Sequence, residues 1–226
     1  MLLPQRRAFS LVEMLVVLGI IALLAAIALP VFNSVRRRGY QTTCASNLKQ
    51  LGLAVNLYQQ DYDGYFPRGG DPTDLHTDLW HDAANGVYEI QAGQLPPLTY
   101  TLSRYIKSPP LWACPADTGF DISDISGQIL DARPSSYEKF GMSYYYRTEL
   151  TLKNKKELAG WDRANVEHGP SDINVLADGH GSWHGEDEPW RLRRYNVLMA
   201  DGRVANMTRH QFKDAWHLNL DGPTAP

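Results

Sequence analysis

The chain has 226 residues, of which 43% are hydrophobic and 21% charged, and its formal net charge is −3. This length allows one ordinary domain, or one domain with an appendage. The composition excludes a collagen-like, a disordered or a strongly basic nucleic-acid-binding chain, so no nucleic-acid partner is expected. The mean hydropathy of −0.37 is typical of a soluble protein, but the apolar residues are unevenly distributed along the chain.

An uninterrupted apolar run covers residues 14–32 and contains no charged side chain. A helix of roughly 20 residues spans the ~30 Å hydrocarbon core of a bilayer, so this run is long enough to cross a membrane. A plain membrane anchor and a cleaved secretory signal are two ordinary interpretations. In a signal, Arg6 and Arg7 would form the basic region and Ala26 and Ala28 the cleavage site, although the run exceeds the usual signal length.

Neither interpretation explains Glu13, which directly precedes the apolar run. A carboxylate in this position is costly unless it is paired or neutralised. The nearest candidate partner is an α-amino group created by cleavage just upstream. The segment from Arg6 to Glu13, RRAFSLVE, resembles the cleavage and methylation motif of type IV prepilins and type II secretion pseudopilins.

This resemblance implies a processing site and an assembly mechanism. A prepilin peptidase on the cytoplasmic side would remove the leader, residues 1–8, by cutting between Ala8 and Phe9, and Phe9 would be N-methylated. Ala8 stands where the family more commonly has Gly. Glu13 becomes the fifth mature residue and would pair with the Phe9 amine of a neighbouring subunit. Pro30 falls where the family often has a helix-kinking proline, whose ring and missing N–H disturb a helix.

The resemblance also implies the location and the partners of the chain. It predicts a single-pass protein of the inner (cytoplasmic) membrane, with a periplasmic or extracellular head that joins a filament after assembly. The expected partners are prepilin peptidase, like or related pilin subunits, an inner-membrane assembly platform and membrane lipid.

Beyond the apolar run, residues 40–62 have the pattern of an amphipathic helix. An apolar stripe recurs at helical spacing and comprises Leu48, Leu51, Val55, Tyr58 and Tyr62. The sequence DYDG at 61–64 is a stop signal, and a proline follows at 67. We therefore expect one long, interrupted helix over residues 9–64, with a membrane half and an amphipathic half, and a globular head over residues 65–226.

The two cysteines, Cys44 and Cys114, form an even pair in a chain with an export-type N-terminus, which favours one disulfide. The alternative is two unpaired buried thiols. No CxxC pair and no Cys/His spacing indicates a structural zinc site. Residues 44–54 and 58–64 are similar to a narrower prepilin-like group. That group also has a Cys-Pro motif, here at Cys114, and a C-terminal H-x9-DG segment.

The head is rich in Gly, Pro, Asp, Trp and Tyr, which predicts few long elements. A short helix is expected over residues 98–106 and a strand over 143–147. The segment 174–180 is echoed by 196–204, and the second copy predicts a hairpin with a type I′ turn at Asp201-Gly202, in which both central residues have positive φ. Paired strands would form a small antiparallel sheet against the helix stripe. This is the α+β, lollipop-like arrangement with long loops that the pilin family has.

A metal site in the head is a weaker expectation. The H-x9-DG pattern would place a histidine at position 191, where this chain has Arg191. Four residues could still converge on a cation, with loop oxygens from 186–188: Asp178, His180, His184 and Asp201. Pseudopilin heads commonly bind Ca²⁺ through carboxylates and carbonyls, so Ca²⁺ is the one candidate cofactor. Asp-Gly is equally an ordinary turn dipeptide.

No enzyme is expected, because the chain has no GxSxG, Walker or HExxH motif. His81, Asp82 and His168 supply acid–base residue types without a pattern. The sequence thus predicts a structural subunit of a type II secretion pseudopilus or a type IV pilus-like filament. The alternative is a membrane-tethered head, or a non-polymerising enzyme, on a pilin-type anchor. Such a head would bind Ca²⁺, or glycan through tryptophans such as Trp183, Trp190 and Trp216.

Overall fold

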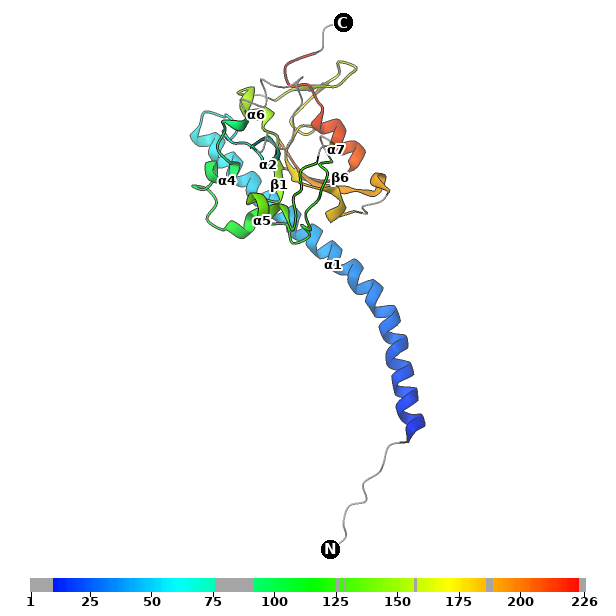
Figure 1. Cartoon of the computed structure of the whole chain (residues 1–226). Coiled ribbons are helices and arrows are strands. Elements are labelled where there is room, and N and C mark those ends of the chain that lie inside the picture. Colours follow the sequence, from blue (N-terminus) through cyan, green and yellow to red (C-terminus); the bar gives the residue numbers. More distant parts are fainter. Residues whose placement is uncertain are drawn as a thin grey trace. The chain divides into compact units, whose positions relative to one another are not determined.

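The computed structural model describes residues 10–75, 92–124, 127, 129–156, 158–185 and 189–223 (Figure 1). Ala8, Phe9, His81, Asp82 and the acidic segment 186–188 lie outside the described residues. The chain divides into two compact units, Met1–Gly39 and Tyr40–Pro226.

Helix α1, Leu11–Asp61, has 51 residues and begins in a sequence-encoded cap. The Ser10 hydroxyl accepts a hydrogen bond from the Val12 amide at 3.3 Å, and the Ser10 amide donates to Glu13 Oε2 at 2.9 Å. A Ser whose own amide is held by a Glu three residues later is the pattern of a capping box. Helix α1 continues through Pro30 as one element, so the helix is not divided there, and the kink that the resemblance implies at this residue stays a prediction. A single proline removes one backbone donor, and the bonds of the remaining helix persist around it.

The end of α1 follows the predicted stop signal. The helix ends at Asp61, and the chain then turns through Asp63 and Gly64, whose φ angles are 52° and 84°. The Gly64 amide donates to the Gln59 carbonyl at 2.7 Å, which satisfies one of the carbonyls left open at the helix end.

In the second unit, the part of α1 after residue 39 presents its apolar stripe to the core. Leu48, Leu51, Val55 and Tyr58 are buried, as the spacing predicts. Tyr62 differs, because 48% of it is exposed and its ring stacks on Tyr58 with centroids 4.1 Å apart.

The described residues of the head contain a four-stranded antiparallel sheet of order β1-β4-β5-β6. Its strands are β1 (Tyr144–Tyr146), β4 (Asn174–Asp178), β5 (Arg194–Met199) and β6 (Val204–Thr208). The expected strand over 143–147 is therefore confirmed, and the two echoing segments are the neighbouring strands β4 and β5. The register pairs Tyr145 with Ala177 and Val197 with Ala205.

The two faces of the sheet pack against different helices. Along β5, Tyr195, Val197 and Met199 join the cluster that contains residues of α7, Arg209–Trp216. Leu198 joins the cluster of the α1 stripe. This alternation follows from the period of two along a strand. At the α1 face the helix has Gly52, where an added Cβ would lie 2.7 Å from Leu198 Cδ1.

The β5–β6 turn corrects one prediction. Gly202 has a φ of 82°, whereas Asp201 is not among the described residues with positive φ, so this is not a type I′ turn. The Met199 amide donates to the Arg203 carbonyl and the Gly202 amide donates to the Met199 carbonyl, both at 2.9 Å. These bonds enclose a three-residue loop whose last residue is left-handed, which is the next most common hairpin geometry.

The remaining described elements are short, as the turn-rich composition predicts. They are α2 (Pro72–Leu75), α4 (Leu98–Thr101), η2 (Pro109–Trp112), α5 (Ser136–Phe140), α6 (Glu149–Leu152), β2 (Gly160–Trp161), β3 (Glu167–His168), η3 (Gly181–Trp183) and η4 (Trp190–Leu192). The helix expected over 98–106 begins at Leu98 but continues as turns after Thr101, where the Tyr105 amide donates to the Leu102 carbonyl at 2.9 Å.

Candidate functional site

The N-terminal half of α1 is the first candidate site. Its large apolar side chains between residues 11 and 35 are exposed, and none of its most apolar 18-residue window is buried within the structure. By length and composition α1 is able to cross a membrane. Glu13 lies in its first turn and, as an anion at a helix N-terminus, also complements the helix dipole.

The second candidate site surrounds the disulfide between Cys44 and Cys114, which are 70 residues apart. The predicted pairing is therefore confirmed. It joins α1 to the loop after η2, and both cysteines are buried. The Ser143 hydroxyl accepts a hydrogen bond from the Cys114 amide at 3.0 Å and donates to Asp117 Oδ2 at 2.7 Å, so the loop is fixed at this point.

His184 and Asp178 lie against this disulfide. His184 Nε2 is 3.4 Å from Cys114 Sγ and 3.4 Å from Asp178 Oδ2, and neither the imidazole nor the carboxylate is exposed to solvent. The backbone amide of Asn196, on β5, donates to Asp178 Oδ2 at 2.6 Å and fixes that carboxylate.

His180 belongs to a different buried cluster, centred on Asp124. Its Nε2 is 3.5 Å from Asp124 Oδ2 and 3.2 Å from Arg193 Nη1, and Arg193 itself forms an ion pair with Asp124. The Tyr195 hydroxyl donates a hydrogen bond to the Asp124 carboxylate, and the Gly181 backbone amide donates another at 3.1 Å.

The pKa of Asp124 reflects these contacts. Burial would raise it, but the attraction of His180, the hydrogen bonds from Tyr195 and Gly181 and the charge of Arg193 together lower the pKa below its ordinary value. Burial first, and then the neighbouring Asp124 carboxylate, raise the pKa of Tyr195 far above its ordinary value.

Asp201 lies apart from both clusters, in the β5–β6 turn, where its carboxylate is 3.4 Å from Arg203 Nε. Of the four residues considered as cation ligands, the structure thus brings together Asp178 and His184. It places His180 with Asp124 and Asp201 with Arg203.

The three tryptophans considered for glycan stacking have different surroundings. Trp183 is buried, and Trp216 is partly buried beside Phe212. Trp190 is 54% exposed, and the guanidinium groups of Arg193 and Arg209 lie 5.7 and 5.2 Å from its ring centre.

A buried arginine, which sequence reasoning missed, connects the C-terminal segment to the core. Arg147 is 2% exposed and donates to Glu149, to Asn174 Oδ1, to the Ala215 carbonyl at 3.2 Å and to the Leu218 carbonyl at 2.6 Å. No motif marks such a residue, because its role depends on carbonyls that only the fold brings within reach.

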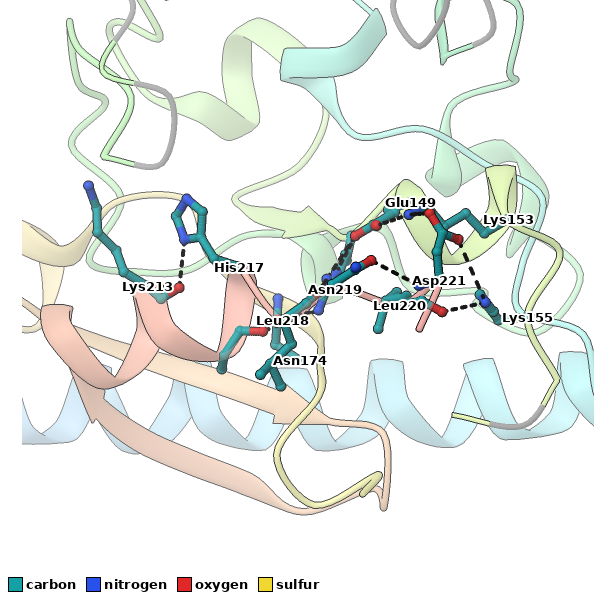
Figure 2. A network of polar contacts seen from close by, with 12 residues as sticks. Glu149, Lys153, Lys155, Asn174, Lys213, His217, Leu218, Asn219, Leu220 and Asp221 are labelled. Atoms are coloured by element: carbon teal, nitrogen blue, oxygen red, sulfur yellow. Dashed lines mark hydrogen bonds and ion pairs between the residues drawn. The ribbon is translucent and has the colours of Figure 1, made fainter. Parts of the chain in front are cut away.

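Figure 2 shows how the network continues from Glu149 toward the surface. Lys153 bridges Glu149, at 2.7 Å, and Asp221, while Lys155 donates to the Leu220 carbonyl at 2.5 Å. His217 donates through Nδ1 to the Lys213 carbonyl at 2.7 Å, within the end of α7.

Comparison with known proteins identifies the N-terminal region. The family described as "Prokaryotic N-terminal methylation motif" matches residues 3–29. Over 62 residues the chain is 39% identical to the type IV major pilin protein PilA of Myxococcus xanthus (strain DK1622). That alignment covers 27% of this chain and 28% of the pilin, and no solved structure matches the chain. The chain thus carries a prepilin-type methylation motif. Its long helix has an apolar N-terminal half and a C-terminal half that packs against an antiparallel sheet, which is a pilin-like α+β fold.

Proposed function

We propose that the chain is a structural subunit of a type II secretion pseudopilus or a type IV pilus-like filament. One observation carries this proposal: the methylation motif at residues 3–29 includes the start of helix α1, whose apolar side chains in this region are unburied. Transfer of each large apolar side chain out of water is favourable by about 1.5–3 kcal/mol, so the segment requires lipid or partner helices around it.

In this proposal prepilin peptidase cuts between Ala8 and Phe9, and Phe9 is methylated. The chain is first held in the inner membrane by α1, with its disulfide-bonded head on the oxidising side. An assembly platform then transfers α1 from lipid into a filament core made of like helices. The N-terminal motif resembles those of both filament classes, and the relative reported above is a type IV major pilin, so the proposal covers both filaments.

Glu13 has two roles in the proposed cycle. Within one chain it accepts the Ser10 amide and completes the helix cap. Within the filament its carboxylate would pair with the Phe9 amine of the neighbouring subunit. A single polar pair in an otherwise uniform apolar bundle fixes the axial register, as a buried Asn does in coiled coils.

The test is the mass of the mature full-length protein, purified from cells with and without an active prepilin peptidase. We expect the chain from peptidase-positive cells to lack residues 1–8 and to carry one methyl group on Phe9. An Ala8→Leu variant should remain uncut, since it places a bulky side chain where the family commonly has Gly. An intact Met1 in peptidase-positive cells would overturn the proposal.

A further inference from the structure

Four side chains around the disulfide form a set with the composition of a metal site. Cys44 lies on α1, Cys114 in the loop after η2, Asp178 at the end of β4 and His184 just after η3. One ligand atom from each lies within 4.8 Å of all the others. Because the four come from four separate parts of the chain, no sequence spacing reveals the set.

The protein leaves part of this set without hydrogen bonds. Asp178 Oδ1 and His184 Nδ1 are both buried without a partner in the described part of the chain. A buried polar atom without a partner costs about 1–3 kcal/mol. Asp178 Oδ2, by contrast, is held by the Asn196 amide at 2.6 Å. The carboxylate is thus fixed through Oδ2, which also lies 3.4 Å from His184 Nε2, while Oδ1 has no hydrogen-bond partner among the described residues.

The distances fit one coordination geometry. Tetrahedral Zn²⁺, with bonds of about 2.0–2.3 Å, holds its ligand atoms about 3.3–3.8 Å apart. His184 Nε2 already lies 3.4 Å from Cys114 Sγ and 3.4 Å from Asp178 Oδ2. The two sulfurs are joined in a disulfide, so they can act as separate thiolate ligands only after that bond is reduced.

We propose that the reduced form of this chain binds one Zn²⁺ through Cys44, Cys114, Asp178 and His184. The reductant is a dithiol of another protein, which supplies two electrons and two protons. Its two S–H bonds break and its sulfurs join as a disulfide, while the Cys44–Cys114 bond breaks and both cysteines become thiols. Zn²⁺ then displaces the two thiol protons to water and forms two Zn–S bonds. The disulfide and the zinc are alternative links between α1 and the Cys114 loop.

The donor set selects the ion. Two thiolates, one imidazole and one carboxylate suit Zn²⁺, whereas Ca²⁺ takes six to eight oxygen ligands, which this cluster does not supply. Outer-shell hydrogen bonds hold two of the four ligands, because the backbone amide of Asn196 orients Asp178 and the Ser143 hydroxyl fixes the backbone at Cys114. All four residues belong to the unit Tyr40–Pro226, whereas the methylation motif lies in the other unit, so this proposal does not rest on the proposed function.

The experiment is a metal titration of the full-length chain in detergent. One sample is reduced with a phosphine, which takes oxygen from water to become the phosphine oxide, and the phosphine is removed without air. Co²⁺ serves as the spectroscopic probe, followed by Zn²⁺ as competitor. We expect the reduced chain to bind one Co²⁺ with thiolate-to-cobalt charge transfer and tetrahedral d–d bands, and Zn²⁺ to abolish both. The oxidised chain should show neither.

Conservative variants assign the ligands. Asp178→Asn and His184→Gln should each weaken Zn²⁺ binding by at least about tenfold, because even outer-shell losses cost 10–100-fold. The matched controls are His168→Gln and Asp162→Asn. The imidazole–carboxylate distance in that pair is also 3.4 Å, but neither residue belongs to the cluster with the cysteines. These variants should bind like the parent. Circular dichroism of every oxidised variant checks the fold without metal.

Two results would overturn the proposal. The first is a reduced chain, folded or unfolded, that gives no thiolate-to-cobalt charge transfer. The second is charge transfer that persists with unchanged affinity in both Asp178→Asn and His184→Gln, which would mean that the thiolates bind metal without the rest of the cluster.

Discussion

The guanidinium of Arg147 donates a hydrogen bond of 2.6 Å to the Leu218 carbonyl, 71 residues further along the chain. A second bond of 3.2 Å reaches the Ala215 carbonyl in the last turn of α7. One side chain therefore joins the end of β1 to the segment that follows the last helix. Carbonyls at a helix end lack partners of their own, and here a buried arginine supplies the donors.

We expect Arg147→Met to destabilise the head by about 3–5 kcal/mol, because removing one member of a buried polar network leaves its partners unsatisfied. Arg147→Lys should recover only part of this loss, since an ammonium lacks the planar fork that reaches both carbonyls. Urea unfolding of the full chain in detergent, followed by tryptophan fluorescence, measures the change.

Lys153→Met is the matched control for this prediction. Lys153 pairs with Glu149 and Asp221, but its side chain is 27% exposed, so the change should cost about 1 kcal/mol or less. If Lys153→Met and Arg147→Met lower the free energy of unfolding equally, the burial of Arg147 does not add to its effect on stability.

The contacts of Asp124 predict that its contribution to the free energy of unfolding depends on pH. The charged and titratable groups that face it are His180, Arg193, Tyr195 and Arg209, and their net effect is a lowered pKa. A carboxyl whose folded pKa is lowered stabilises the protein above its unfolded pKa of about 3.9 and loses this stabilisation as the pH falls through the folded value. Asp124→Asn should therefore cost about 3 kcal/mol at pH 7, and the difference should shrink below pH ~4.

Asp121→Asn is the control at an exposed site. Its carboxylate pairs with Arg133 at 2.7 Å, and a hydrogen bond from that arginine lowers its pKa, but the two side chains are 60% and 56% exposed. Solvent screening should make its effect much smaller than that of Asp124→Asn. Urea midpoints measured from pH 7 to pH 3 compare the two variants. A gap between Asp124→Asn and the parent that stays constant to pH 3 would contradict the assignment.

Two variants of Glu13 separate its role in the helix cap from its proposed role in a charge pair within the filament. Glu13→Ala removes the acceptor of the Ser10 amide and the charge together, whereas Glu13→Gln keeps an acceptor that fits a capping box. If the carboxylate pairs with an amine in the filament, both variants should lose incorporation, since breaking a buried pair costs about 3–5 kcal/mol. Both should still insert into the membrane.

Immunoblots of sheared filaments and of membrane fractions measure these two outcomes. A Glu13→Gln variant that assembles like the parent, beside a defective Glu13→Ala, would show that helix capping is the only role of Glu13.

The features that the sequence predicted correctly are those with local causes. The burial of Leu48, Leu51 and Val55 follows from helical periodicity, and the end of α1 follows from turn residues such as Gly64. The hairpin was predicted but its turn type was not. Asp-Gly is compatible with several turns, and the number of residues between the paired strands decides among them.

The polar clusters of the head were not predictable in the same way. His180 and His184 were expected to converge on one cation, but with η3 between them the two imidazoles belong to different clusters. Asp124 and Arg147 match no motif. Their importance comes from burial and from partners distant in the sequence, and both are properties of the tertiary fold.

The close approach of α1 to β5 gives the last prediction. At Gly52 an added Cβ would lie 2.7 Å from Leu198 Cδ1, so Gly52→Val should overpack the interface and destabilise the head by about 1–3 kcal/mol. Leu53→Val, at the next and 55% exposed position, tests the effect of a β-branched residue in the helix alone and should cost at most about 0.7 kcal/mol. Leu198→Ala should offset part of the Gly52→Val loss in urea unfolding, with a coupling of at least about 0.5 kcal/mol. If the changes in unfolding free energy of Gly52→Val and Leu198→Ala are strictly additive, the side chains at these two positions do not clash.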